Sequence, residues 1–321
     1  MKTLASLAVV VPVFNEAQLV TRTLPAILAA ARDAAPGTQV QLIAVDDGSR
    51  DATREALAQL AASEPALRFV SFTRNFGKEA AIHAGLRLAQ EGGAQATLVI
   101  DADLQHPPAL IAPMVQAWRE GAMVAEGVKR QRGDESGLRR LAARAFYDGF
   151  SRMSGLKLQE DTDFKLLDAQ VVRAVLELGE RGRFFRGIVR WLGYDAARIE
   201  FDVAPRAGGA SAWSVMGLAR YAWRNLTSFS SAPLGLVTWF GGIGLALGVV
   251  LAAKALLDKI EGRALSGFST VILLQVIFSS LILLSLGIIG NYIARIYDEL
   301  KQRPHYVIRP EDLRAPGEQG S

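Results

Sequence analysis

Asp101 and Asp103 stand one residue apart in the segment VIDADLQHPP, directly after an apolar run that ends at Ile100. Two carboxylates with this spacing at the end of a strand can offer oxygen ligands to a hard divalent cation, and the amide oxygen of Gln105 can be a third ligand. A cation held there would neutralise a diphosphate leaving group, which is Lewis-acid assistance to its departure. A loop cap without an ion is the alternative interpretation of the same residues.

A second pair of carboxylates, Asp46 and Asp47, ends another apolar run in the segment VDDGSRDAT. These side chains can accept hydrogen bonds from a base N–H or from ribose hydroxyls. The same segment can equally open a helix with an acidic N-cap. The sequence therefore leaves nucleoside binding and helix capping open at this position.

Five apolar, β-rich runs alternate with helix-length segments in the N-terminal part of the chain. Strands that are apolar throughout and alternate with helices predict a parallel sheet covered by helices on both faces. In such a sheet, ligands bind at the carboxyl ends of the strands. The five predicted strands cover residues 7–13, 40–45, 67–72, 96–100 and 122–128.

A polar cluster follows each of the five predicted strands. Because the carboxyl ends of parallel strands lie at the same edge of a sheet, we expect all five clusters on one rim. A rim of this composition suits the transfer of a sugar from a nucleotide sugar. The clusters are, in chain order, PVFNE, DDGSRD, TRNFGKE, DADLQ and VKRQR.

Two long apolar runs near the C-terminal end predict membrane-spanning helices at about residues 234–257 and 268–293. A run of about 20 apolar residues matches the hydrocarbon core of a bilayer. Arginines and lysines flank the outer ends of this pair, whereas the connecting segment DKIEGRALSG balances two acids with two bases. This asymmetry predicts that both chain termini face the cytosol. Two buried helices in a soluble core are the alternative.

The composition excludes several classes of function. The chain has no cysteine, so it can form neither a disulfide framework nor a thiolate metal site or nucleophile. Its 36 basic and 32 acidic residues nearly balance, and no part of it resembles a nucleic-acid-binding surface. The apolar run within MKTLASLAVVVPVFNE is too short to span a membrane, and we expect it to be the first buried strand of a cytosolic domain.

Two segments combine an apolar helical stripe with arginines on another face, namely residues 138–153 and 213–229. Such helices lie along the surface of a bilayer, although an ordinary amphipathic helix on a soluble core has the same pattern. The tail after Tyr306 has little to bury and is expected to be loose. The predicted domains are a cytosolic catalytic domain over 1–212, a juxtamembrane amphipathic helix over 213–230, two transmembrane helices within 231–300 and a cytosolic tail over 301–321.

The motifs VVPVFNE, VDDGSRDAT, FTRNFGKEAA, DADLQHPP and TDFKLLD, in this order, resemble those of family 2 glycosyltransferases of the GT-A fold. In particular, the chain resembles the polyprenyl-phosphate glycosyltransferases, the group that contains bactoprenol glucosyltransferases and dolichyl-phosphate mannose synthases. The resemblance covers nearly the whole chain. It implies an α/β, Rossmann-like GT-A domain that ends in interfacial amphipathic helices and two C-terminal transmembrane helices.

The resemblance also implies roles for individual residues. The nucleotide sugar would contact Pro12, Phe14, Glu16, Asp46, Asp47, Lys78, Asp101 and Ala102. Mg²⁺ or Mn²⁺ would be bound by Asp101, Asp103 and Gln105. The acceptor phosphate would be bound by Arg130, Arg206 and Ser211.

In one place the chain departs from its relatives. Many of them carry a lysine directly after the serine of the RxxGxS motif, and this chain has Ala212 there. Lys129, Arg130 or Arg132 can supply the missing positive charge. Arg206 and Ser211 would therefore bind the acceptor phosphate without the neighbouring lysine that many relatives have.

The implied reaction is the inverting transfer of a hexose from a nucleotide-diphosphate sugar, with UDP favoured, to a polyprenyl (undecaprenyl) phosphate. The product would be a lipid-phosphate-linked monosaccharide for modification of cell-envelope glycans. Because a phosphate monoester is already anionic at neutral pH, no strong general base is required. Asp103 and Asp163 are the candidate catalytic residues. Asp163 would orient the acceptor phosphate or its arginines, unless it is a structural carboxylate at a strand end.

The implied location is the cell (inner) membrane, with the catalytic domain and both termini in the cytoplasm. The expected partners are the nucleotide-sugar donor, the polyprenyl phosphate, the bilayer, further copies of the chain, a downstream flippase and a second glycosyltransferase, but no nucleic acid. A processive polysaccharide synthase is one alternative, although the segment GIVRW has Gly187 where such enzymes carry the glutamine of QxxRW. A catalytically silent scaffold that binds nucleotide sugars is another, and the intact DADLQ argues against it.

Overall fold

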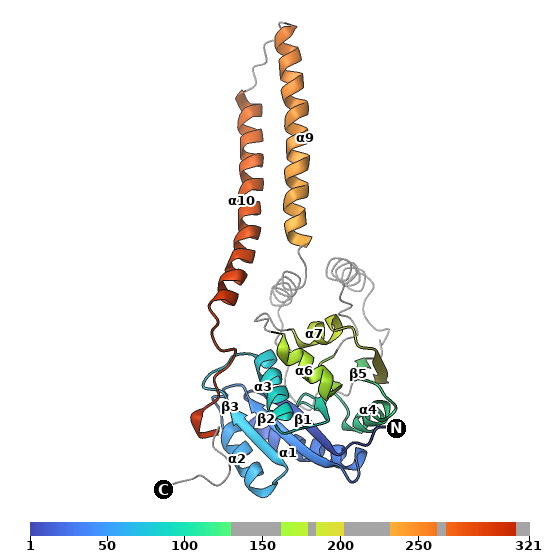
Figure 1. Ribbon diagram of the computed structural model, residues 1–321. Coiled ribbons are helices and arrows are strands. Elements are labelled where there is room, and N and C mark those ends of the chain that lie inside the picture. The colour runs from blue at the N-terminus through green and yellow to red at the C-terminus, as the bar shows by residue number, and fades with distance from the viewer. Residues whose placement is uncertain (130–161, 179–183, 202–231, 262–267, 313–321) are drawn as a thin grey trace, which may run out of the picture. The chain divides into compact units, whose positions relative to one another are not determined.

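The structure is a computed structural model that describes residues 1–129, 162–178, 184–201, 232–261 and 268–312 of the chain (Figure 1). The chain divides into two compact units. The first unit is an α/β domain, and it also includes the C-terminal segment from Arg303 onward. The second unit contains two long helices.

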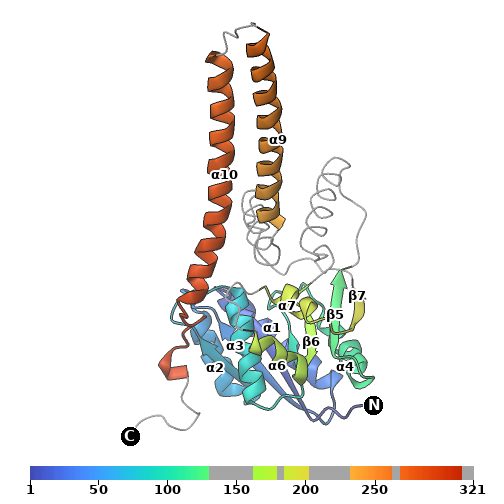
Figure 2. The same ribbon diagram turned by 45° about the horizontal axis from the view of Figure 1, so that its top comes forward.

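The α/β domain is built on a seven-stranded sheet with the strand order β3-β2-β1-β4-β6-β5-β7 (Figures 1 and 2). Strands β1 to β4 are parallel to one another, and β5 is parallel to β7. All five strands predicted from the sequence are present. The strands are β1 (Ser6–Val13), β2 (Gln39–Asp46), β3 (Leu67–Ser71), β4 (Ala96–Val99), β5 (Val124–Lys129), β6 (Lys165–Asp168) and β7 (Ala196–Phe201).

The five predicted strands all run in one direction, but the sheet as a whole is mixed, because the additional strand β6 runs antiparallel to both of its neighbours, β4 and β5. The pattern of apolar residues did not predict β6, which has only four residues and begins and ends with a charged side chain. Lys165 is nevertheless buried, and its ammonium lies 2.6 Å from the carboxylate of Glu126, its register partner on β5. A buried charge needs such a partner, and this ion pair satisfies that requirement.

Helices cover both faces of the sheet. On one face α1 packs against α2 and α4, and on the other face α3 packs against β1, β2 and α6, with α7 beside α6 (Figures 1 and 2). Alternate residues of β1 serve the two faces, since Val9 and Val11 join the core with α1 while Val10 meets Gly85 of α3. The helices are α1 (Ala17–Ala34), α2 (Thr53–Ser63), α3 (Lys78–Glu91), α4 (Ile111–Arg119), α6 (Ala169–Glu177) and α7 (Phe185–Trp191), and a short 3₁₀ helix, η1 (Pro108–Leu110), precedes α4.

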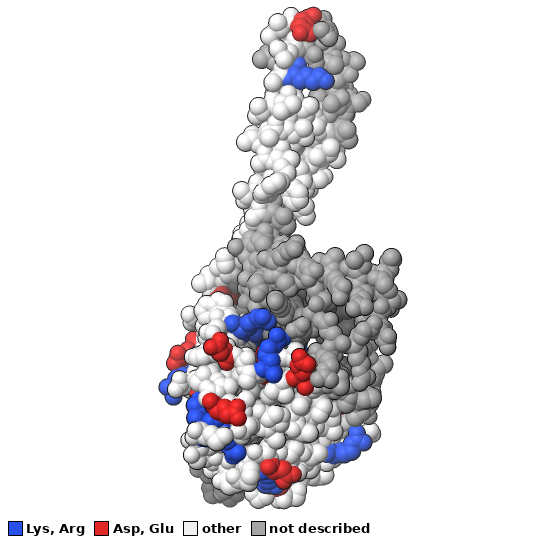
Figure 3. Space-filling view, turned by 90° about the vertical axis from the view of Figure 1, so that its right-hand side faces the viewer, with Lys and Arg blue, Asp and Glu red and all other residues white. Residues whose placement is uncertain are grey.

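In its described part, the second unit contains the helices α9 (Ala232–Ile260) and α10 (Phe268–Leu300), which pack against each other. Within the described part of the chain, only Leu274–Leu300 is long and apolar enough to cross a membrane by length and composition, with a mean hydropathy of 2.0. The apolar stretch of α9, Val237–Leu251, is shorter. The second predicted span thus overlaps a candidate membrane-crossing helix, whereas the first does not meet the same criterion. On the face that Figure 3 shows, coloured charges of this unit lie at its upper end.

Several predictions concern residues outside the described ranges. These are the amphipathic segments 138–153 and 213–229 and the acceptor residues Arg130, Arg206 and Ser211.

The prediction of a loose tail after Tyr306 is wrong for the residues up to Asp312. Phe72, which directly follows β3, forms an antiparallel bridge with Ile308. The amide of Arg309 also donates a hydrogen bond to the carbonyl of Ser71 at 2.9 Å. The tail therefore covers an edge that β3 would otherwise leave open.

Candidate active site

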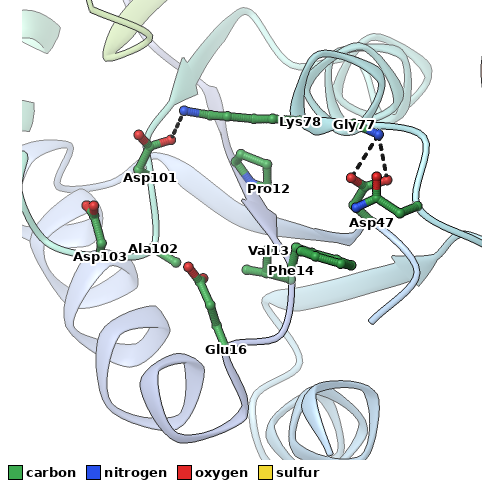
Figure 4. Close-up of a pocket in the computed structure, with 11 residues that line it drawn as sticks. Pro12, Val13, Phe14, Glu16, Asp47, Gly77, Lys78, Asp101, Ala102 and Asp103 are labelled. Atoms are coloured by element: carbon green, nitrogen blue, oxygen red, sulfur yellow. Dashed lines mark hydrogen bonds and ion pairs between the residues drawn. The ribbon is translucent and has the colours of Figure 1, made fainter. Parts of the chain in front are cut away.

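A pocket of about 300 Å³ lies at the carboxyl ends of β1 to β4 (Figure 4). Each of these four strands contributes the polar cluster that follows it, as the sequence predicts. The fifth cluster begins at the end of β5 and continues into residues that the structure does not describe. The lining residues are Pro12, Val13, Phe14, Glu16, Asp47, Asn75, Gly77, Lys78, Asp101, Ala102 and Asp103.

The loop after β2 fixes the loop after β1. The amide of Asn15 donates to Ser49 Oγ, and the amide of Glu16 donates to Thr53 Oγ1, both at 2.8 Å. Asp46 is buried, and its carboxylate accepts a hydrogen bond from the amide of Ser49 at 2.9 Å. Asp46 is not among the residues that line the pocket. Its visible role is therefore to hold the turn that presents Glu16.

Asp47 connects the loop after β2 to the loop after β3. Its carboxylate accepts hydrogen bonds from the amide of Phe76 at 2.7 Å and from the amide of Gly77 at 2.9 Å, and Figure 4 shows the contact with Gly77. Burial raises the pKa of Asp47, although these two hydrogen bonds oppose the shift. The loops approach closely at Gly48, which has a φ of 69° and where a Cβ would lie 2.6 Å from the carbonyl oxygen of Arg74. Both the left-handed backbone and the lack of space require glycine there.

Three carboxylates, those of Glu16, Asp101 and Asp103, line one part of the pocket (Figure 4). Burial, together with the charges of Asp103 and Asp101, raises the pKa of Glu16 to about 7. Glu16 Oε2 is buried without a hydrogen-bond partner. An ion between these groups would relieve their mutual repulsion, so the site fits a cation chemically.

Two of the three predicted metal ligands lie in the lining of the pocket. Asp101 and Asp103 line the pocket, whereas Gln105 does not, and the amide of Gln105 donates to Asp103 Oδ1 at 3.0 Å. Among the described residues, no group of three or more His, Cys, Asp or Glu side chains could hold a metal ion by itself. A cation at this site would thus share its coordination between the two aspartates and oxygens of a bound ligand.

Lys78, the first residue of α3, lies between the carboxylate of Asp101 and that of Asp163. Its ammonium lies 2.6 Å from Asp101 Oδ1 and 2.6 Å from Asp163 Oδ2. Burial alone would lower the pKa of Lys78, but the charges of these two carboxylates outweigh that effect and raise it above its usual range. The side chain is 41% exposed. Lys78 therefore presents a permanent positive charge at the pocket.

Asp163 is only 3% exposed and lies behind Lys78 rather than in the lining of the pocket. Arg186, on α7, donates hydrogen bonds to its carboxylate at 2.6 Å from Nε and 2.9 Å from Nη2. Burial alone would raise the pKa of Asp163, but the hydrogen bonds from Arg186 and the charge of Lys78 hold it well below its usual range. Asp163 is thus ionised at neutral pH. Arg186 could not be predicted from its sequence context, because no local motif links it to a carboxylate 23 residues away.

Glu79, which follows Lys78, is a further buried carboxyl that the sequence analysis did not single out. It accepts a hydrogen bond from the amide of Phe185, at the start of α7, at 2.8 Å. Burial, together with the charge of Asp163, raises the pKa of Glu79 from 4.5 to about 7. Its protonation state therefore changes near neutral pH.

The raised pKa of Glu79 predicts a pH-dependent stability. Between pH about 4.5 and about 7, the folded state binds more protons at Glu79 than the unfolded state does, so the free energy of unfolding should fall as the pH rises through this window. Replacing Glu79 with glutamine should flatten that fall. Thermal unfolding midpoints measured across this pH range would test the effect. Glu91→Gln, at an exposed position of the same helix, is the control, and parallel profiles for Glu79→Gln and the wild type would contradict the prediction.

Several known proteins are similar to this chain. Residues 8–175 match the model of a family described as glycosyl transferase family 2. An uncharacterised glycosyltransferase of Synechocystis sp. is 37% identical over 270 residues, which are 84% of this chain and 84% of that one. The bactoprenol glucosyl transferase of Shigella phage SfV is 32% identical over 309 residues, covering 95% of this chain and 98% of that one.

A solved structure, that of glucosyl-3-phosphoglycerate synthase from Mycobacterium tuberculosis, is also similar. It is 19% identical, covers 70% of this chain and 80% of that one, and gives a TM-score of 0.47. At this distance the similarity bears on neither the substrate nor the site residues.

The family match begins in β1 and includes the four loops that line the pocket. The two relatives extend the similarity beyond the α/β domain. The resemblance seen in the sequence motifs is therefore confirmed, and the protein is a glycosyltransferase with a GT-A-like α/β fold. The chain belongs to glycosyl transferase family 2.

Proposed function

We propose that the protein transfers a hexose from a nucleotide-diphosphate sugar, with UDP as the nucleotide, to a polyprenyl phosphate, with inversion at the anomeric carbon. The single observation that carries the proposal is the pocket at which the loops of four parallel strands place Asp101, Asp103 and Lys78. Relatives named bactoprenol glucosyl transferase support the acceptor class, since one of them matches over 95% of this chain.

The donor is proposed to lie with its nucleoside toward Pro12, Phe14 and Asp47 and its diphosphate toward the aspartates. Mg²⁺ or Mn²⁺, held by Asp101 and Asp103 with oxygens of the donor, would neutralise the charge that develops on the leaving diphosphate. Lys78 adds a fixed positive charge beside these residues, because its pKa stays above its usual range. Positioned charges of this kind lower the barrier most when they are set before the reaction begins.

In the proposed step, an oxygen of the lipid phosphate attacks the anomeric carbon in line with the leaving group. A new bond forms between that oxygen and the anomeric carbon, and the bond to the β-phosphate oxygen breaks. The electron pair leaves on the nucleoside diphosphate. No proton needs to move, because a phosphate monoester has a second pKa near 6 and is anionic at neutral pH.

This chemistry agrees with the state of Asp163. A carboxylate whose pKa is held well below its usual range is a weak base, so Asp163 is poorly suited to deprotonate a hydroxyl. Its contacts with Lys78 and Arg186 instead suit a role in orienting these two positively charged side chains. Arg130, Arg206 and Ser211 are the proposed ligands of the acceptor phosphate.

The two long helices are proposed to anchor the domain in the cell (inner) membrane, with the catalytic domain and both termini in the cytosol. The polyprenyl chain would then stay in the bilayer while its phosphate reaches the pocket. Assembly with further copies of the chain, and passage of the product to a flippase and a second glycosyltransferase, belong to the same proposal.

A donor panel tests the reaction class. Purified protein is incubated with Mn²⁺, undecaprenyl phosphate and one radiolabelled nucleotide sugar at a time. The proposal expects label to enter the organic phase with at least one UDP-sugar for the wild type but not for Asp103→Ala. Label in a polymer would favour a processive synthase. No transfer from any donor would favour a scaffold.

A further inference from the structure

The segment His305–Asp312, here called the C-terminal strap, forms an added edge on the sheet of the α/β domain. Phe72 and Ile308 form an antiparallel bridge. On either side of the bridge, the amide of Thr73 donates to the carbonyl of Val307 and the amide of Arg309 donates to the carbonyl of Ser71, both at 2.9 Å. Because β3 is the first strand of the sheet, these bonds occupy backbone groups that an edge strand leaves unpaired.

Side chains reinforce the backbone bonds of the strap. The ring of Tyr306 stacks on the buried ring of Phe72 with 4.9 Å between centroids. The carboxylate of Asp312 accepts a hydrogen bond from the amide of Ser71 at 2.8 Å and forms an ion pair with Arg54 of α2 at 2.9 Å. The Asp312 side chain is only 6% exposed. The strap is thus held at both of its ends.

The strand that the strap covers leads directly into the donor pocket. Phe72 contacts Phe76 edge to face, with 5.8 Å between the ring centroids. The amides of Phe76 and Gly77 bind Asp47, and Asn75, Gly77 and Asp47 line the pocket. The loop between β3 and α3 is therefore fixed at its start by the strap and at its end by Asp47.

We propose that the C-terminal strap positions the nucleoside side of the donor pocket, with Tyr306 as its main positioning residue. The strap acts through Phe72 and the loop that follows it, which keeps the amides of Phe76 and Gly77 in place for Asp47. Tyr306 itself does not line the pocket. This inference rests on the proposed function, because it assumes that a nucleotide binds there. It also gives the segment that follows α10 a role in donor binding that its sequence does not suggest.

Two matched pairs of variants test the strap. Tyr306→Ala removes the stacked ring, and Tyr306→Phe keeps it. Arg309→Pro removes the amide that bonds to Ser71, and Arg309→Ala keeps that amide. Val307→Ala is a further control, since the side chain of Val307 is 44% exposed and its backbone carbonyl makes the bond.

The measurements are the Kd of UDP in the presence of Mn²⁺, the KM values of donor and acceptor, and kcat. In Tyr306→Ala and Arg309→Pro, the Kd of UDP and the donor KM should rise about 5- to 50-fold, the range of a coupling between neighbouring sites. The acceptor KM and kcat should stay within about twofold of the wild type, as should every constant of the three control variants. An equal loss in all constants would indicate a merely structural role and overturn the inference.

Hydrogen exchange gives a local readout that does not depend on activity. Amides of residues 72–78 should exchange faster in Tyr306→Ala and Arg309→Pro than in the wild type, while those of β1 stay protected. The inference would be overturned if the amides of the strap exchange faster than in the wild type while those of residues 72–78 exchange at the wild-type rate. Failure of the wild type itself to bind UDP or any other nucleotide would instead overturn the proposed function, so the two failures are distinguishable.

Discussion

Replacing Asp103 with asparagine is expected to lower kcat/KM for sugar transfer by about 10³-fold, because it removes a charge that faces the leaving diphosphate. Asparagine has nearly the same size as aspartate, and its carbonyl oxygen can still accept the hydrogen bond that the amide of Gln105 donates to Asp103. The loop should therefore keep its shape. The loss would come from weaker cation binding and from poorer neutralisation of the diphosphate.

Initial rates measured over a range of Mn²⁺ concentrations would separate these two effects. A high Mn²⁺ concentration should restore the part of the activity that is lost through weaker cation binding, and the loss that remains reports the poorer neutralisation of the diphosphate. Asp195→Asn, at an exposed position away from the pocket, is the matched control and should leave the rates unchanged. An Asp103→Asn variant with a kcat/KM within about threefold of the wild type would contradict a role for this carboxylate in the reaction.

Replacing Lys78 with methionine is expected to lower kcat by about 10²- to 10³-fold. The ammonium lies 2.6 Å from both Asp101 and Asp163, so its loss removes a positive charge from the pocket and leaves two carboxylates without their shared partner. Methionine retains the length of the side chain and much of its apolar contact. The expected loss therefore reports the charge rather than the packing.

Measurement of kcat and of the thermal unfolding midpoint in the same preparation tests this prediction. Arg87→Met, which removes an exposed cation from the same helix, is the control and should leave kcat unchanged. Lys78→Arg should recover only part of the activity, because a planar guanidinium does not replace a compact ammonium between two carboxylates. A Lys78→Met variant with normal kcat would mean that the charge between these carboxylates has no part in the chemistry.

The sequence predicted the positions of the first five strands and the meeting of their polar loops. That prediction was possible because buried parallel strands are apolar throughout and their carboxyl ends share one edge. The short strand β6 was missed, since its buried Lys165 breaks the apolar pattern and forms an ion pair with Glu126 on another strand. Such a strand forms through interactions between residues that are far apart in the sequence, and a local pattern does not reveal these interactions.

The same limit applies to the site. Asp47, Asp101, Asp103 and Lys78 could be predicted because each lies in a motif at a strand end. The support of Asp163 by Arg186 could not be predicted, because it depends on how α7 packs. The part of the C-terminal strap that follows Tyr306 was predicted to be loose for the same reason, since only the fold shows that it pairs with the backbone at the end of β3.

Phosphorus-31 NMR of a single reaction mixture tests the central claim most directly, because it follows both the acceptor phosphate and the donor diphosphate. With undecaprenyl phosphate, Mg²⁺ and the donor that gives transfer, the phosphomonoester signal should be replaced by a phosphodiester signal, with one nucleoside diphosphate released for each lipid converted. The Asp103→Asn variant should show neither change. Release of nucleoside diphosphate with the phosphomonoester left intact would mean that the sugar goes to water or to another acceptor, and would contradict transfer to the lipid phosphate.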